Sequence, residues 1–441
     1  MKKLSLFLLF LSSCLTVFST DPNDWKKTTA DPDFIHRAIK EMTDVIVYDI
    51  YSPPVASRTY AYISIGGYEA MVPGSKGMIS LAGQVKGLPA LPQAPTTEIS
   101  NMISAVEAIL VIGKSMVISE KTVEAFRTQI LAELKSSGIP LETYNNSIAW
   151  GDKVAAHIIA WAAKDNYKQT RGMDRYALND NESSWKPTPP AYMKAIEPHW
   201  SKMRVWVMDS AKQFKPLPAL AFAKTKNSPF YKEANKVYIA GKALTAEQTE
   251  IAMFWDCNPF KMNVNGHVMF ATKKISPGGH WINITRLACK QSNADYSTAL
   301  EAYARISMVL ADAFISCWDE KYRSNVIRPE TYINQYIDPN WIPLLQTPPF
   351  PEYTSGHSVV SNAAQVVLTK QFGENFKYQD STEIEFGLPV RSFTSFKHAA
   401  QEAAISRFYG GIHYMPAIDN GMVEGEKIGK HLVSKLRTRE N

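Results

Sequence analysis

The segment LADAFISCWDEKYRSNVIRP, residues 310–329, contains a helical pattern that joins apolar residues to a lysine. Four of its side chains follow one another at steps of four, four and three residues, which places them on one face of a helix: Leu310, Phe314, Trp318 and Lys321. A lysine therefore belongs to an apolar, inward-facing stripe. Three interpretations stay open, because the ammonium group serves a buried site, extends past the stripe to solvent, or caps the carbonyls at the C-terminal end of the helix.

Helical periodicity continues along most of the chain. The predicted helices are 33–51, 55–72, 97–112, 119–136, 141–164, 229–240, 246–256, 281–292, 295–321 and 358–372. The residues Pro277-Gly278-Gly279 predict a break before the helix near 281. Alternating strand patterns are scarce, so the predicted fold class is all-α, a helical bundle.

Residues 165–216 contain Trp, Tyr and Pro without a clear period, which predicts an ordered but irregular connection. The change in composition makes this connection the predicted internal boundary. The chain then divides into an N-terminal helical region, 21–216, and a second region, 217–441.

The composition is that of a globular protein and excludes two other classes. The chain has 441 residues, of which 45% are hydrophobic and 20% charged, which is too apolar for a disordered chain. The net charge of +6 is small for this length and argues against a nucleic-acid-binding protein. Beyond Cys14, the three cysteines lack CxxC spacing and so indicate neither a zinc site nor a disulfide framework, although one disulfide stays open: Cys257, Cys289 and Cys317.

Residues 1–20 are typical of a secretory signal, because Lys2 and Lys3 precede a short apolar run at 4–11. The sequence LSSC at 11–14 resembles a bacterial lipobox, in which Cys14 would carry the lipid; ordinary cleavage near Ser19 is the alternative. We therefore expect an exported protein at the periplasm or outer surface, with a membrane association only through this lipid. After residue 20 no run is long enough to span a bilayer.

Two further segments concentrate groups that bind anions. In FPEYTSGH, residues 350–357, Ser355 and Gly356 stand where a helix begins and offer a hydroxyl and unpaired backbone N–H groups. In SRFYGGIH, residues 406–413, the glycine pair ends a helix and places His413 after a turn. Each histidine alone is equally explained as an ordinary core residue.

Together the three segments supply cations, neutral donors and imidazoles, which are Lys321, Arg328, Arg407, Ser355, Gly356, His357 and His413. A ligand that uses all of them is a tetrahedral oxyanion with several charges, phosphate or vanadate. Burial of three cations without such an anion would be costly.

The set resembles the vanadium-dependent haloperoxidase and type 2 phosphatidic acid phosphatase superfamily, whose site is written K-x6-R-P, P-S-G-H and S-R-x5-H-x3-D. The first motif is complete in Lys321, Arg328 and Pro329. Thr354 replaces the proline of the second motif. Ala417 replaces the aspartate of the third, and the nearest acid is Asp419. The motifs cover about residues 318–419, so the second region would be the catalytic one.

The resemblance implies a role for each matched residue. Five would hold the oxygens of a vanadate cofactor: Lys321, Arg328, Ser355, Gly356 and Arg407. His413 would bind the vanadium through a ring nitrogen, and His357 would be the acid–base group. The activity implied is oxidation of a halide by hydrogen peroxide, with vanadate as a Lewis acid.

Two aromatic residues occupy positions that line the halide pocket in this superfamily, Trp318 and Phe350. Both match what chloroperoxidase-like members carry, but ordinary core aromatics explain them equally well and the halide stays open. Weaker likeness to bacterial haloperoxidase-like proteins lies at 52–58, 254–256 and 278–281. There Asp256 is either a site residue or a helix-end carboxylate paired with a lysine.

Two alternatives use the same oxyanion site. In a soluble, exported acid phosphatase, His413 would attack phosphorus to form a phosphohistidine and His357 would protonate the leaving group. In a non-enzymatic surface lipoprotein, the site would bind phosphate without turnover, and binding would survive loss of His357. The sequence thus predicts small-molecule substrates, hydrogen peroxide with halide or a phosphomonoester, and leaves the oligomeric state open.

Overall fold

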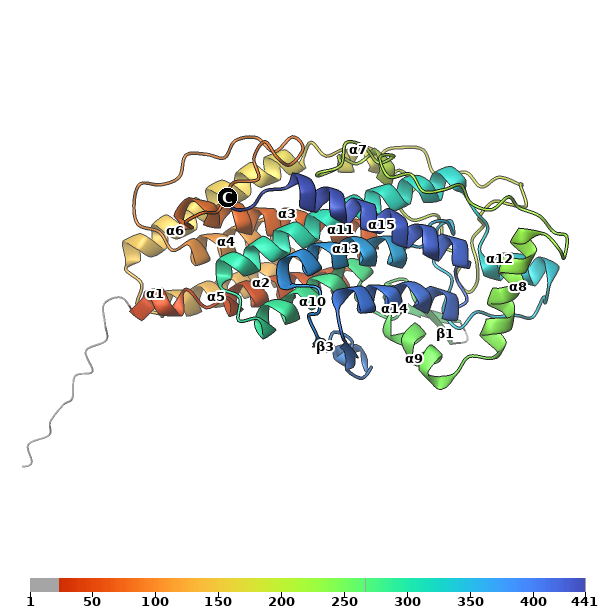
Figure 1. The fold of residues 1–441 in the computed structure, drawn as a ribbon. Helices are drawn as coiled ribbons and strands as arrows, with labels where there is room; N and C mark the ends of the chain where they lie inside the picture. The colour runs from red at the N-terminus through yellow and green to blue at the C-terminus, as the bar shows by residue number, and fades with distance from the viewer. Residues whose placement is uncertain (1–23, 266, 441) are drawn as a thin grey trace, which may run out of the picture.

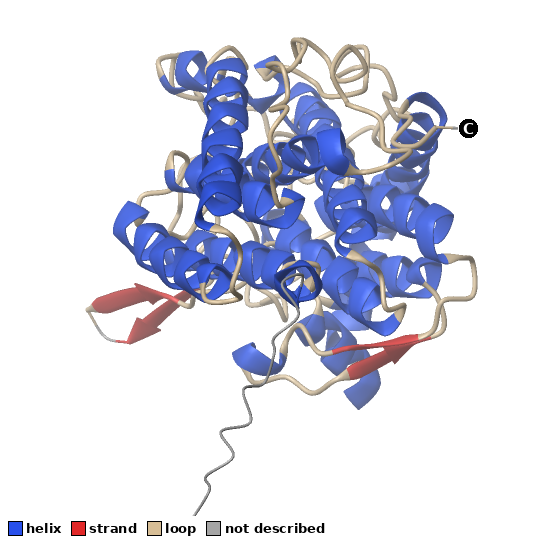
Figure 2. Cartoon of the chain, turned by 90° about the vertical axis from the view of Figure 1, so that its left-hand side faces the viewer, coloured by secondary structure: helices blue, strands red, loops and turns tan. Residues whose placement is uncertain are grey.

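The structure is a computed structural model that describes residues 24–265 and 267–440. Fifteen α-helices dominate these residues, and the strands form only two short hairpins at the edge of the molecule (Figures 1 and 2). The predicted all-α helical bundle is therefore confirmed. The predicted signal segment at 1–20, including Cys14, lies outside the described residues.

The first part of the chain forms seven helices: α1 (Asp24–Thr28), α2 (Asp33–Tyr48), α3 (Pro53–Met71), α4 (Asn101–Lys114), α5 (Glu120–Lys135), α6 (Leu141–Ala162) and α7 (Tyr167–Arg171). The second part forms eight: α8 (Pro229–Lys242), α9 (Ala246–Phe254), α10 (Pro277–Gln291), α11 (Tyr296–Ser324), α12 (Pro329–Tyr336), α13 (Gly356–Phe372), α14 (Phe396–Tyr409) and α15 (Met415–Lys435). All ten predicted helices are present, with ends displaced by four residues or fewer.

The remaining regular elements are short. The hairpins pair β1 (Met262–Asn265) with β2 (Val268–Ala271), and β3 (Tyr378–Asp380) with β4 (Arg391–Phe393), both antiparallel. Single 3₁₀ turns lie at Val72–Gly74, Trp200–Lys202 and Ile384–Phe386. Residues 165–216 contain only α7 and one of these turns, so the predicted irregular connection is confirmed.

The long helix α11 runs through the middle of the bundle, with α3, α10, α13 and α15 packed along it (Figure 1). Its 29 residues span about 44 Å. Asp295 caps its first turn by accepting from the Thr298 N–H, and Asn325 ends it in the left-handed conformation. Because neighbours surround it, α11 is buried along almost its whole length, and its last turn carries Lys321 into the interior.

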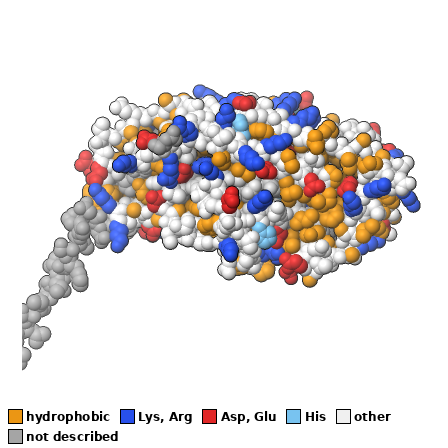
Figure 3. All heavy atoms as spheres, in the orientation of Figure 1, with side chains coloured by type: hydrophobic (Ala, Val, Ile, Leu, Met, Phe, Trp, Pro, Cys, Tyr) orange, Lys and Arg blue, Asp and Glu red, His pale blue; other side chains and the backbone are white. Residues whose placement is uncertain are grey.

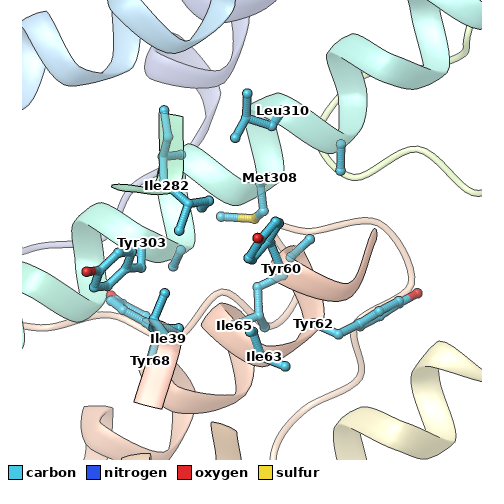
Figure 4. Packing of buried hydrophobic residues seen from close by; sticks show 14 of the residues in the cluster. Ile39, Tyr60, Tyr62, Ile63, Ile65, Tyr68, Ile282, Tyr303, Met308 and Leu310 are labelled. Atoms are coloured by element: carbon cyan, nitrogen blue, oxygen red, sulfur yellow. The ribbon is translucent and has the colours of Figure 1, made fainter. Parts of the chain in front are cut away.

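One apolar cluster extends from Trp25 near the start of the described chain to Leu436 near its end. Figure 4 shows its middle, where Tyr60 of α3 and Ile282 of α10 lie near Met308 of α11. The helices before and after residue 216 therefore share one core, and the division there into two regions stays a prediction.

The predicted break at Pro277-Gly278-Gly279 is wrong, because these residues form the first turn of α10. The Ser276 side chain accepts from the Gly279 N–H and caps the helix. Proline is favoured at the first helical position, where its missing N–H costs nothing. A Cβ at Gly279 would lie 2.7 Å from Ile275 and 3.0 Å from the Tyr60 hydroxyl, so close packing requires glycine here.

Helix α15 is absent from the predicted helices although it is 21 residues long. Three glycines at steps of four residues lower its intrinsic helix propensity: Gly421, Gly425 and Gly429. All three face α13, and a Cβ on each would lie 2.9 Å or less from α13 atoms. The glycines thus allow two backbones to approach closely, and this packing outweighs the propensity.

Replacement of Gly425 by alanine tests that close approach. Its Cβ would lie 2.1 Å from the Val359 carbonyl oxygen, so the two helices would have to separate. We expect Gly425→Ala to lower the free energy of unfolding by about 1–3 kcal/mol, as overpacked cores do, measured by urea denaturation. Gly172→Ala is the control, because its Cβ meets only one carbonyl oxygen at 3.7 Å. Equal stabilities of the two variants would contradict the packing argument.

The face of the molecule in Figure 3 shows no separation of charges by sign. On the face in Figure 3, basic and acidic side chains are interspersed. None of the helices within 24–265 and 267–440 combines the length and apolar character that a membrane span requires.

Candidate active site

The three sequence motifs meet where several helices begin or end. Lys321 lies in the last turn of α11, Arg328 directly before α12, Ser355 directly before α13, Arg407 in the last turn of α14, and His413 between α14 and α15. The bundle thus brings residues that are up to about ninety positions apart in the sequence to one place. We call Lys321, Arg328, Ser355, Gly356, Arg407 and His413 the oxyanion site.

Lys321 is fully buried, so it does not extend to solvent. Its Nζ donates to three backbone carbonyls, those of Pro351 at 3.1 Å, Glu352 at 3.1 Å and Thr354 at 2.5 Å. An ammonium group has three donors, so these bonds hold the chain that leads into Ser355. Burial lowers the pKa of Lys321 to about 8, and the nearby Arg328 adds to the shift.

Arg328 is also fully buried, and it forms a hydrogen bond with His413. Its Nε donates to the Phe350 carbonyl at 2.9 Å, and its Nη1 donates to the Ile412 carbonyl at 2.9 Å and to His413 Nε2 at 3.1 Å. Burial lowers its pKa to about 10. Nη2 is buried without a hydrogen-bond partner among the described residues, so one donor of the guanidinium group is left for a ligand.

Arg407 approaches the site from α14. Its Nε donates to the Ser406 hydroxyl at 3.0 Å and its Nη2 to the Ala252 carbonyl at 3.2 Å. Burial lowers the pKa of Arg407, and the negative charge of Asp256 opposes this shift. Asp256 accepts from Lys274 at 2.9 Å and lines the same cavity as Arg407, so it is both a lysine partner and a neighbour of the site.

His413 is oriented by Glu352. Its Nδ1–H donates to Glu352 Oε1 at 2.8 Å, which also accepts from the Tyr414 N–H at 3.0 Å. Because Arg328 donates to Nε2, the ring is the neutral Nδ1–H tautomer with its lone pair on Nε2. Burial, Arg328 and the other cations hold the pKa of His413 well below its usual range.

The sequence named Asp419 as the acid nearest to the third motif, and the partner of His413 is instead Glu352. Asp419 is exposed on α15, and the charges that act on its pKa are those of Glu233 and Lys236. Glu352 precedes the second motif and lies 61 residues from His413, so motif spacing could not identify it. Burial raises the pKa of Glu352 to about 7, against the effect of Arg328 and Lys321.

The start of α13 supplies neutral donors and the second imidazole. The Ser355 hydroxyl accepts from the Ser358 N–H, so this residue is an N-cap as predicted. The first N–H groups of the helix, from Gly356 onward, have no partner within the helix. Burial and Arg407 hold the pKa of His357 well below its usual range, and a ring N–H donates to the Trp255 carbonyl. His357 Nε2 has no hydrogen-bond partner among the described residues.

The structure explains why threonine stands at the usual proline position of the second motif. The Thr354 hydroxyl donates to Glu424 Oε2 at 2.8 Å, and the Ser316 hydroxyl donates to Glu424 Oε1 at 2.7 Å. Thr354 thus joins the loop before α13 to both α11 and α15. Neither the acid nor the serine belongs to a motif, so the sequence did not reveal this link.

A small cavity of about 40 Å³ adjoins the oxyanion site. Its polar lining includes His357, Arg407 and His413, and its apolar lining includes Trp318 and Phe350. The two aromatic rings lie 4.9 Å apart. A cavity needs only roughly 10–15 Å³ of such space to take one water, so this cavity has room for a small ion or molecule. A larger pocket of about 560 Å³, within residues 170–199, contains none of the predicted site residues.

The oxyanion site fits vanadate or phosphate. Three buried carboxyl groups lie near its three cations, but Asp256 is paired with Lys274, and burial raises the pKa of both Glu352 and Glu424 to about 7. An excess of positive charge therefore remains, which a bound anion would offset. Arg328 Nη2 and His357 Nε2 are polar atoms without partners inside the described protein. His413 Nε2 carries a lone pair, which is the form of imidazole that binds metals, and Arg328 Nη1, which donates to this nitrogen, would have to release it for a metal to bind. The fold and site thus define a helical protein that binds a multiply charged oxyanion.

Comparisons with known proteins narrow this class. A model of the second helical-bundle domain of VCPO matches residues 301–440. A bacterial vanadium-dependent iodoperoxidase of known structure is 47% identical, with 93% of this chain and 98% of that chain covered and a TM-score of 0.88. The holo structure of a bacterial vanadium-dependent chloroperoxidase is 14% identical, with 88% of this chain and 93% of that chain covered and a TM-score of 0.65. The apo structure is also 14% identical, with 87% of this chain and 94% of that chain covered and a TM-score of 0.65. No curated protein sequence matches.

The chain belongs to the vanadium-dependent haloperoxidases. Its activity is that of a peroxidase, and its cofactor is vanadate. This membership decides between the enzyme classes that the motifs left open, in favour of the haloperoxidase over the acid phosphatase.

Proposed function

We propose that this haloperoxidase oxidises iodide with hydrogen peroxide. The observation that carries the choice of halide is the 47% identity, over 93% of the chain, to a protein named as an iodoperoxidase. Vanadate, when bound, supplies a Lewis acid that activates hydrogen peroxide. Iodide is the most polarisable and least strongly hydrated of the common halides, so a cavity lined partly by Trp318 and Phe350 costs it the least hydration energy.

The side chains of the oxyanion site have separate tasks in this proposal. Arg328 and Arg407 neutralise the charge of the bound oxyanion and donate hydrogen bonds to its oxygens. Ser355 and the N–H groups that begin α13 add neutral donors. Lys321 keeps a positive charge beneath the site and holds the chain before Ser355. His413 would hold vanadium through Nε2, with Arg328 Nη1 then donating to the oxyanion in place of that nitrogen.

His357 moves the proton in this proposal. Its lowered pKa keeps the imidazole neutral at neutral pH, so Nε2 can accept a proton as hydrogen peroxide binds. The hydrogen bond from the ring to the Trp255 carbonyl fixes the ring position. His357 can then return the proton to the oxygen that leaves as water.

A paired assay tests the function. The purified chain is incubated with orthovanadate, hydrogen peroxide and iodide, and separately with a phosphomonoester without vanadate. We expect vanadate-dependent iodide oxidation and a lower rate with bromide. Hydrolysis of the phosphomonoester without any halide oxidation would support the phosphatase alternative instead. Phosphate binding without either reaction, unchanged in His357→Ala, would support the non-enzymatic alternative.

The lowered pKa of Lys321 predicts how vanadate binding depends on pH. Its ammonium group loses its charge as the pH rises through about 8, which removes a cation from beneath the oxyanion. We expect the ratio of the wild-type to the Lys321→Met association constants for vanadate to be constant below pH 8 and to fall above it, measured by calorimetry. Vanadate ionises in the same way in both titrations, so the effect of its ionisation cancels in the ratio. A ratio that does not change from pH 6 to 10 would contradict a charged Lys321 in binding.

We also infer that the chain is exported and anchored by a lipid at Cys14, as the leader predicts. Mass spectrometry of the mature N-terminus provides the test. A diacylated Cys14 would support the anchor, and an unmodified terminus near residue 20 would support ordinary cleavage.

A further inference from the structure

A buried group of three potential metal ligands lies below the cavity. Cys257 follows α9, His280 belongs to the first turn of α10, and Glu383 lies between β3 and β4. His280 Nδ1 lies 3.4 Å from Cys257 Sγ and 3.2 Å from Glu383 Oε1, and Sγ lies 3.9 Å from Oε1. All three side chains are buried. We propose that these residues, the zinc cluster, bind one Zn²⁺ ion.

The spacing of the three ligand atoms suits tetrahedral zinc. Zinc lies about 2.3 Å from sulfur and about 2.0–2.2 Å from nitrogen and oxygen, so ligand atoms around it lie about 3.3–3.6 Å from one another. Of the observed distances, 3.4 Å lies within this range, 3.2 Å lies just below it and 3.9 Å lies a few tenths of an ångström above it. An ion in the centre would need only small shifts of the side chains.

A second carboxylate orients the histidine for metal binding. His280 Nε2–H donates to Asp380 Oδ2 at 2.8 Å, which leaves Nδ1 to face Cys257 and Glu383. The other oxygen of Asp380 accepts from the Thr382 N–H at 2.9 Å and from its hydroxyl at 2.5 Å. Histidines that bind zinc typically donate their other N–H to a carboxylate fixed in this way.

The chemistry of the ligands favours zinc over magnesium and calcium. A thiolate is a soft ligand that magnesium and calcium do not favour, whereas zinc commonly combines sulfur, imidazole and carboxylate ligands. The thiolate of Cys257 and the carboxylate of Glu383 together balance the charge of Zn²⁺, so the buried cluster becomes neutral. Three protein ligands leave a fourth position for water.

The zinc cluster supports the part of the site that contains His357. The His280 ring stacks on Trp255, with centroids 4.6 Å apart and planes at 21°. The Trp255 carbonyl accepts from the ring of His357, and Cys257 lines the cavity beside His357. The ion would therefore join the end of α9, α10 and the β3–β4 connection beneath the acid–base residue. This inference does not depend on the proposed function.

Metal analysis of the full-length chain tests the inference. The protein is purified without an affinity tag or chelator, and zinc is measured by inductively coupled plasma mass spectrometry. We expect one zinc per chain in the wild type and in Cys289→Ala, whose buried free thiol lies outside the cluster. We expect less than a tenth of that in Cys257→Ala. Equal zinc in the two variants would overturn the proposal.

A second measurement uses the wild-type chain, so it does not depend on the folding of a variant. After removal of metal, Co²⁺ is titrated and absorption is recorded. We expect one equivalent of Co²⁺ to produce a thiolate-to-cobalt charge-transfer band, and zinc to remove it. Absence of this band, or of bound zinc in the purified protein, would show that His280 is only hydrogen-bonded to its acidic neighbours and would refute the site.

Discussion

The His413→Ala variant is expected to lose vanadate-dependent iodide oxidation by at least about a thousandfold, because removal of even one well-placed donor from such a site costs roughly a hundred- to a thousandfold. Glu352 accepts from His413 Nδ1–H and Arg328 donates to Nε2, so the ring is held with the lone pair on Nε2, which Arg328 would release to vanadium. His357, the other imidazole that lines the cavity, begins α13, and its ring hydrogen-bonds to the Trp255 carbonyl instead. The measurement is the rate of triiodide formation at saturating vanadate and hydrogen peroxide.

The matched control is His398→Ala, which removes an exposed imidazole of α14. We expect this variant to retain the wild-type rate. The free energies of unfolding of both variants show whether any loss comes from unfolding. A folded His413→Ala variant with more than a tenth of the wild-type rate would show that His413 is not the vanadium ligand.

The helices of the fold were predictable where apolar periodicity and caps agreed. Helix α11 is the best example, since Leu310, Phe314 and Trp318 lie at helical spacing and all are buried. The prediction failed where tertiary packing outweighs local propensity, as in α15, whose glycines allow contact with α13. It also failed at Pro277, which starts a helix because Ser276 caps it.

The residues of the oxyanion site were predictable because their types and spacing are unusual together. Their spacing could not show whether each side chain is buried or which groups it hydrogen-bonds. Whether Lys321 reaches solvent depends on what covers the end of α11, and the chain before Ser355 covers it with three carbonyls. The roles assigned to these residues stay predictions that the variants above test.

The partners of the site residues were not predictable, because they come from positions distant in the sequence and outside the motifs. Glu352 and Glu424 are ordinary acids in the sequence, and only burial beside His413 and Thr354 distinguishes them. The three cysteines were considered for a disulfide, and all three are buried and free. Cys257 instead faces His280, which is 23 positions away without a recognisable metal-binding motif.

Loss of the Glu352 side chain is the second large effect that we expect. Glu352→Ala should lower the affinity for vanadate by about 10–100-fold, the usual cost of removing a group that orients a metal-binding histidine. Without the carboxylate, the Nδ1–H of His413 has no acceptor, so only Arg328 still orients the ring. A bound oxyanion that draws Arg328 away would then leave the ring free to turn or to carry its proton on Nε2, where the proton would block a bond to vanadium.

Electrostatics alone predicts the opposite sign, because removal of an acid makes the site more positive and should favour an anion. This gain is small near neutral pH, since burial raises the pKa of Glu352 to about 7 and the group is only about half ionised there. Calorimetric titration with vanadate at pH 7 measures which effect is larger. A higher affinity in Glu352→Ala would show that charge outweighs orientation.

Two further variants separate orientation from other effects of the mutation. Glu352→Gln keeps an amide oxygen that can accept from Nδ1–H, so its affinity should lie between those of the wild type and Glu352→Ala. Asp419→Asn changes the acid that motif spacing had indicated. Because Asp419 is exposed on α15, the affinity of this variant for vanadate should equal that of the wild type. If Asp419→Asn weakened vanadate binding while Glu352→Ala did not, the orienting acid would be Asp419.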